Sequence, residues 1–112
     1  MVHRPHIRTA IPKRRYRLGG CEATLLGEID SADPRSYRFI LAFVPAGQGE
    51  PSLYVCAERE PGGDRLRVVG AVFDEVVAEG LAWEDADDFA AQALALGAEV
   101  LGLGGVEAQR LR

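Results

Sequence analysis

The chain has 112 residues, of which 47% are hydrophobic, and a formal net charge of −4. This length is typical of one domain that buries a core without metals or disulfides, and the hydrophobic fraction excludes disorder throughout. No apolar run approaches the roughly 18 residues of a membrane-spanning helix, so we expect no membrane partner, and two cysteines are too few for a disulfide scaffold.

The N-terminus is charged and is interrupted by Pro5, with no apolar segment behind it. It does not have the pattern of a secretory signal, so we expect a cytoplasmic protein. Twelve of the 13 basic residues are arginine, and alanine and glycine are abundant, which is typical of a biased bacterial genome rather than of a function.

Charge is unevenly distributed along the chain. The first 17 residues carry six cations and no acid, whereas residues 74–107 carry nine acids and no Lys or Arg. A basic N-terminal segment and an acidic C-terminal third can attract each other, within one chain or between two.

The first part of the chain predicts an arm followed by strands. Residues 1–13 lack periodicity and contain two prolines, which indicates a flexible or extended basic arm. Gly19-Gly20 then breaks the pattern, and apolar-rich runs separated by turn residues predict four strands. These strands cover residues 21–29, 37–44, 52–60 and 65–70.

The last part of the chain predicts a helix. Residues 71–83 fit helical and strand spacing about equally, and we expect strand up to about residue 72 and then a short helix or an irregular link. A helix capped by Asp85 or Asp87 follows, with an acidic first turn that suits the helix dipole. Residues 106–112 are expected to form a frayed tail. The apolar stripe of this helix comprises Phe89, Ala93, Leu96 and Val100.

Together these elements predict an α+β fold, an antiparallel β-meander of about four strands with a C-terminal α-helix packed on one face. Residues 14–105 then form a single domain between the arm and the tail.

A simple meander centred on the turns predicts the register of this sheet. Its first face is apolar, which suits a helix packed against it. The pairs expected there are Leu25 with Leu41, Ala23 with Phe43, Ile29 with Tyr37, Leu41 with Val55, Phe43 with Leu53, Phe39 with Ala57, and Ala57 with Val68. The second face carries a charged row, and cross-strand pairs of this kind stabilise by about 0.2–1 kcal/mol each. This row runs Glu28–Arg38–Glu58–Arg67.

Beside the charged row the second face is apolar, and monomers rarely leave such a patch bare. Either residues 71–83 or the N-terminal arm folds over it, or it is the interface of a homodimer or of a complex with another protein. A buried ligand pocket is a third possibility. The predicted interface residues are Leu26, Ile40, Ala42, Tyr54 and Cys56.

Signals of catalysis or metal binding are weak. His3 and His6 lie in the arm, where their spacing is a poor metal signal. Cys21 and Cys56 fall on opposite sheet faces, so no disulfide is expected, and no histidine of the folded body activates either thiol. The acids of residues 84–88 suit a helix start. We therefore predict no catalytic residue, no metal site and no cofactor.

One short basic segment is the sharpest local feature. Four cations and an aromatic ring within five residues can grip phosphates and stack a base. The acidic remainder of the chain favours a different role, a solubilising arm or an arm docked on the acidic C-terminal third. Binding of another anionic ligand is a further possibility. The residues of this segment are Lys13, Arg14, Arg15, Tyr16 and Arg17.

The leading hypothesis is a small non-enzymatic protein-interaction module that self-associates as a homodimer through the second face. The alternative is a nucleic-acid-binding accessory protein that uses the basic N-terminal segment. An enzyme is least favoured, because the sequence indicates no pocket of convergent titratable groups.

Overall fold

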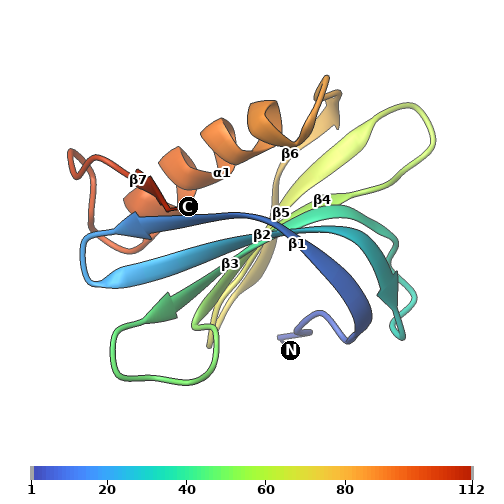
Figure 1. The fold of residues 1–112 in the computed structure, drawn as a ribbon. Coiled ribbons are helices and arrows are strands. Elements are labelled where there is room, and N and C mark those ends of the chain that lie inside the picture. Colours follow the sequence, from blue (N-terminus) through green and yellow to red (C-terminus); the bar gives the residue numbers. More distant parts are fainter. Residues whose placement is uncertain (1, 112) are drawn as a thin grey trace.

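In a computed structural model that describes residues 2–111, an antiparallel sheet of seven strands carries one α-helix on one of its faces (Figure 1). The strand order is β6-β5-β4-β3-β2-β1-β7, so six strands form a meander and the last joins the edge at β1. The predicted α+β class with a C-terminal helix on the sheet is confirmed, but the strand count is seven rather than four. The elements are β1 Ile7–Leu18, β2 Cys21–Ser31, β3 Tyr37–Pro45, β4 Leu53–Glu58, β5 Asp64–Val69, β6 Asp74–Leu81, α1 Ala86–Val100 and β7 Gln109–Leu111.

The predicted arm is the first correction. Residues 7–13 belong to β1, which pairs with β2 along its length, so the sheet begins well before residue 14. Leu18 pairs with Cys21, which makes Gly19-Gly20 a two-residue hairpin turn, and Gly19 has a φ of +57° that favours glycine. Such a glycine pair between two strands is a signal of a hairpin and not only of a break.

The segments on either side of the helix also belong to the sheet. Residues 74–81 form β6 on β5, where a short helix or an irregular link was expected. Residues 109–111 of the predicted tail form β7 on β1, and residues 1 and 112 lie outside the described part of the chain. In both segments pairing with a neighbouring strand decides the structure, because their local preferences are weak or ambiguous.

The central register is as predicted over β2, β3 and most of β4. The confirmed pairs are Leu25 with Leu41, Ala23 with Phe43, Leu41 with Val55, Phe43 with Leu53, and Phe39 with Ala57. Between β4 and β5 the prediction is wrong by two residues, since Ala57 lies opposite Leu66 and Val68 opposite Val55. A shift of two preserves the faces, so the apolar residues of β5 still point toward the helix.

Irregular backbone moves two residues to the other face. Glu28 has a φ of +48°, and the register of β3 with β4 shifts between Tyr37 and Phe39. One extra residue in a strand reverses the side on which the following residues lie. Ile29 and Tyr37 were expected on the first face, and they pack instead on the second face against Ile40.

The predicted charged row does not form as a straight row. Arg67 lies opposite Cys56, although its guanidinium still reaches Glu58 diagonally at 2.9 Å. The other two members of the row form ion pairs outside it, Arg38 with Asp64 and Glu28 with Lys13.

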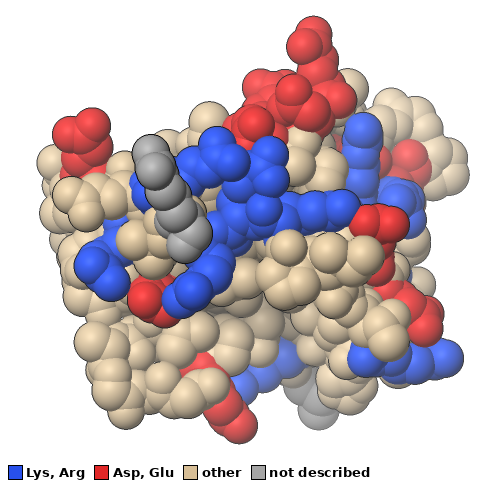
Figure 2. Space-filling view, in the orientation of Figure 1, with Lys and Arg blue, Asp and Glu red and all other residues tan. Residues whose placement is uncertain are grey.

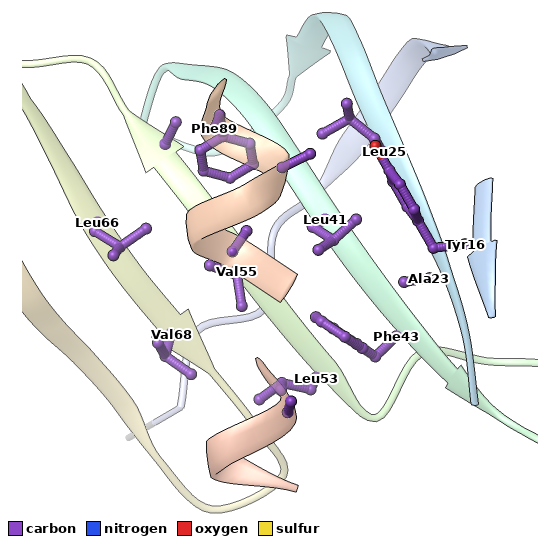
Figure 3. Packing of buried hydrophobic residues seen from close by; sticks show 14 of the residues in the cluster. Tyr16, Ala23, Leu25, Leu41, Phe43, Leu53, Val55, Leu66, Val68 and Phe89 are labelled. Carbon is purple, nitrogen blue, oxygen red and sulfur yellow. The ribbon is translucent and has the colours of Figure 1, made fainter. Parts of the chain in front are cut away.

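The main core lies between the first face and α1 (Figure 3). Phe89 is fully buried there, edge-on to Trp83 at 5.1 Å between ring centroids and stacked on Phe39 at 5.5 Å. Asp85 caps the helix by accepting a hydrogen bond from the backbone N–H of Asp88. This confirms the first of the two predicted caps.

The buried stripe of α1 differs from the prediction in its last turns. Phe89 and Ala93 are buried as expected, but Val100 is 41% exposed. Gly97 is buried instead and faces the ring of Phe43, so small residues bring the helix close to the sheet.

Candidate functional site

The second face of the sheet is covered by the N-terminal residues, which lie on the side opposite α1 (Figure 1). Ile40 and Cys56 are fully buried, and Ala42 is nearly so. Leu26 and Tyr54 keep part of their surface exposed. Three of the five predicted interface residues therefore offer almost no surface to a partner while the N-terminal residues stay in place.

Hydrogen bonds fix residues 2–6 over this face. The backbone N–H of His3 donates to Asp74 at 3.1 Å, and the carbonyl of His3 accepts from Arg35 at 3.3 Å. The backbone N–H of His6 donates to Asp33 at 3.0 Å, and the carbonyl of His6 accepts from the backbone N–H of Ala32 at 2.7 Å. Residues 2–6 are thus held over the second face at both ends of the segment.

Buried ion pairs lie beside this cover. Glu58 and Asp74 have side chains only 3% and 7% exposed, and each accepts from Arg67, at 2.9 and 2.7 Å. Arg35 reaches both carboxylates as well, at 3.7 and 3.0 Å. Burial opposes ionisation of Asp74, but the hydrogen bonds from Arg67 and Arg35 outweigh it and lower its pKa below the ordinary value.

This ion-pair network is suited to holding strands together and not to acid–base catalysis. A general acid or base needs a pKa near the working pH and a free proton position, whereas Asp74 stays ionised and is bound by two arginines. The network joins β4, β5, β6 and the loop before β3 to the N-terminal segment.

Four of the five predicted nucleic-acid-binding residues lie on the surface of β1. β7 pairs with the same strand and adds Arg110 opposite Tyr16. Figure 2 shows Lys and Arg side chains gathered in a strip along this edge of the sheet. We call this strip the basic ridge, and its members are Lys13, Arg14, Arg15, Arg17 and Arg110.

Four members of the basic ridge have acidic partners within the chain. Their ion pairs are Lys13–Glu28 at 2.6 Å, Arg14–Asp87 at 3.3 Å, Arg15–Glu22 at 3.2 Å and Arg17–Glu22 at 3.8 Å. All of these side chains keep at least a third of their surface exposed. Exposed pairs of this kind contribute about 0–1 kcal/mol, so they hold the cations only weakly against a competing anion.

Arg110 is the member that sequence analysis missed. It is exposed and makes no ion pair with the described residues. Part of the basic ridge lines a hollow of about 330 Å³, to which Arg110 contributes from the β7 side. The hollow is lined by Pro12, Lys13, Arg14, Arg15, Arg110 and Leu111.

Tyr16 does not belong to the exposed part of the ridge. It alternates with Arg15 and Arg17, so it points into the core beside Leu25 and is only 7% exposed (Figure 3). Burial raises the pKa of its hydroxyl. The predicted stacking of a base on this ring is therefore not available in this fold.

The remaining candidates have structural explanations. Cys21 lines a second hollow of about 340 Å³ whose wall consists largely of the turns after β1 and β3. The acids around Asp85 bond to the backbone at the start of α1, since Asp88 accepts from the N–H of Glu84 at 3.1 Å. Residues 2–111 contain no group of three or more His, Cys, Asp or Glu side chains placed to hold a metal ion.

The fold and the ridge define the class of this protein as an α+β domain whose antiparallel sheet has one strongly basic edge. Within the described chain, no helix has the length and apolar character needed to span a bilayer. Comparison with family models, curated proteins and solved structures finds no match to the chain.

Proposed function

We propose that the protein is a small non-enzymatic module that binds the phosphate backbone of nucleic acids through the basic ridge. The observation that carries this proposal is the concentration of four cations of β1 and Arg110 of β7 along one edge of the sheet, in a chain whose net charge is −4. Cations concentrated on one face attract a polyanion even when the whole molecule is acidic.

The expected binding mode is contact with phosphates and not readout of bases. Arginine and lysine hold phosphates without regard to sequence, and the one aromatic ring of the segment, Tyr16, is buried. Five phosphate contacts on a single strand predict a slope of about −3.5 for log Kobs against log salt, at about −0.7 per contact.

Self-association through the second face is the weaker proposal for the intact chain. It needs Ile40 and Cys56 at the surface, and both are buried by residues of the same chain. Self-association through this face requires that residues 2–6 first move away from it.

Fluorescence anisotropy with a labelled 20-nucleotide single strand, measured from low to moderate salt, tests the proposed function. The double variant Arg15→Glu/Arg110→Glu removes two phosphate contacts and should lower the steepness of the salt slope by about 1.4, at about 0.7 per contact. At low salt its Kd should be at least tenfold higher than that of the wild type, and several unrelated sequences should behave alike.

The matched control is Arg59→Glu, because Arg59 is exposed, lies next to the β4–β5 turn and is not part of the ridge. It should change the Kd less than twofold. Equal losses in both variants would indicate a general charge effect and contradict the proposal. So would a wild type that leaves the anisotropy unchanged at the lowest salt concentration.

A further inference from the structure

The far end of the sheet carries the opposite charge. β6 is the last strand of the order β6-β5-β4-β3-β2-β1-β7, and no other strand among residues 2–111 pairs with its outer side. α1 packs chiefly over β2, β3 and β4, so the helix does not shield this edge. An edge strand presents a row of free N–H and C=O groups, which is a template for a further strand.

The two edges of the sheet are protected differently. The β1 edge has a proline at residue 12, and β7 pairs with it over residues 15–17. Each of these devices hinders the addition of another strand. β6 has eight residues and no proline, and no strand among residues 2–111 pairs with its outer side. The register shifts of β1 and β6 both lie in the pairing with the inner neighbour and do not distinguish the two edges.

The exposed side chains of β6 indicate which kind of partner strand matches this edge. Glu75 and Glu79 are exposed, and Glu79 makes only a long contact of 3.7 Å with Arg65. Val77 is 46% exposed, and Val72 just before the strand is 87% exposed. A partner strand with cations and apolar residues matches this edge, whereas a second copy of β6 would set acid against acid.

We propose that the outer edge of β6 is a docking site for an extended cationic segment of a partner protein, which adds to the sheet as an eighth strand. Main-chain hydrogen bonds supply the affinity, and Glu75 and Glu79 select for cations over anions. The site lies at the opposite end of the sheet from the basic ridge, so it is independent of nucleic-acid binding.

The test is hydrogen exchange and ¹⁵N chemical shifts of the full chain with two eight-residue peptides, the cationic KTKVTVKT and the acidic ETEVTVET. The cationic peptide should shift β6 resonances and slow the exchange of alternate β6 amides at least tenfold. The acidic peptide should leave β6 unchanged. A cationic peptide N-methylated at alternate residues should lose the effect, because it cannot complete the ladder of hydrogen bonds.

A charge-swap variant tests the selectivity. Glu75→Lys/Glu79→Lys should reverse the preference between the two peptides, and the matched control Glu99→Lys/Glu107→Lys, at two exposed acids away from β6, should retain it. The proposal is overturned if neither peptide protects β6 at millimolar concentration or if both protect it equally. It is also overturned if β6 becomes protected on raising the concentration of the protein alone, which would make a second copy the occupant.

Discussion

Gly97 shows how one missing side chain sets the distance between helix and sheet. A Cβ atom built on Gly97 would lie 2.1 Å from the Cζ atom of Phe43, whose ring is fully buried. Neither the ring nor the helix can move away without opening the core around Phe89, since protein interiors are close-packed. The glycine therefore fits the helix to the sheet, although glycine is a poor helix former.

Gly97→Ala should destabilise the protein despite the better helix propensity of alanine. Overpacking of a core costs about 1–3 kcal/mol, alanine returns at most about 1 kcal/mol, and the severity of the contact leads us to expect a net loss of about 2 kcal/mol. Urea denaturation measures this as a lower midpoint at unchanged slope.

The matched control is Gly104→Ala. Gly104 has open space around its Cα and no positive φ, so the change should stay within about 0.5 kcal/mol. If Gly97→Ala proved as stable as the wild type, α1 would not pack closely against the ring of Phe43.

At the scale of elements, the N-terminal segment decides whether the second face is a buried layer or a surface. Residues 2–6 are held by backbone hydrogen bonds to Asp33 and Asp74, and Ile7 packs against the cluster around Ile40 and Cys56. An irregular segment, fixed by hydrogen bonds at its two ends, thus covers the second face of the sheet, as a helix does in other folds.

Deletion of residues 1–6 should uncover Cys56. In the intact chain this thiol is fully buried, and burial raises its pKa, so almost no thiolate is present to react. In a Cys21→Ser background, we expect the rate of labelling by a thiol reagent to rise at least tenfold on deletion. Thermal unfolding of the truncated chain must remain cooperative for the comparison to count.

Light scattering of the same truncated chain tests the self-association hypothesis. A dimer that Ile40→Asp abolishes would support an interface through the exposed second face, as the apolar pattern of β2, β3 and β4 suggested. Unchanged labelling of Cys56 would instead mean that the N-terminal segment is not what covers it.

At the scale of the whole molecule, the sheet has a basic edge at β1 and β7 and an acidic edge at β6. The sequence shows this polarity along the chain, and the meander converts it into two ends in space because consecutive strands lie side by side. The proposed site for a polyanion and the proposed site for a cationic segment therefore lie at opposite ends of one sheet.

The three tyrosines report on the integrity of this fold at high pH. Burial raises the pKa of Tyr16, Tyr37 and Tyr54 above the ordinary value near 10. The folded state therefore keeps these protons at a pH where the unfolded chain loses them. The resulting stability is fully present below about pH 10 and is lost as pH rises through the folded-state pKa values.

Absorbance at 295 nm against pH measures this directly. At about pH 10.5, above the ordinary tyrosine pKa, the native protein should show less than half the phenolate signal of the chain unfolded in guanidinium. Further ionisation should coincide with loss of the far-ultraviolet dichroism. Superimposable titration curves for the native and unfolded protein would show that the phenols are not buried.

The central strands and the helix could be predicted because their signals are local. Alternation of apolar residues placed Leu25, Leu41 and Val55 on one face, and the acids before Phe89 indicated the helix cap; both are read within a few residues of sequence. β6 and β7 could not be predicted with the same rules, because their residues have weak or ambiguous preferences and become strands only by pairing with β5 and β1.

The features of the candidate site were likewise predictable only in part. The class of fold, the apolar second face and the cations of residues 13–17 follow from sequence patterns alone. The tertiary fold buries Tyr16 and brings Arg110 to the ridge. It also covers the second face through contacts such as that between His3 and Asp74, 71 positions apart. Local sequence sets the period and the turns, whereas burial and pairing depend on which distant segments the folded sheet brings together.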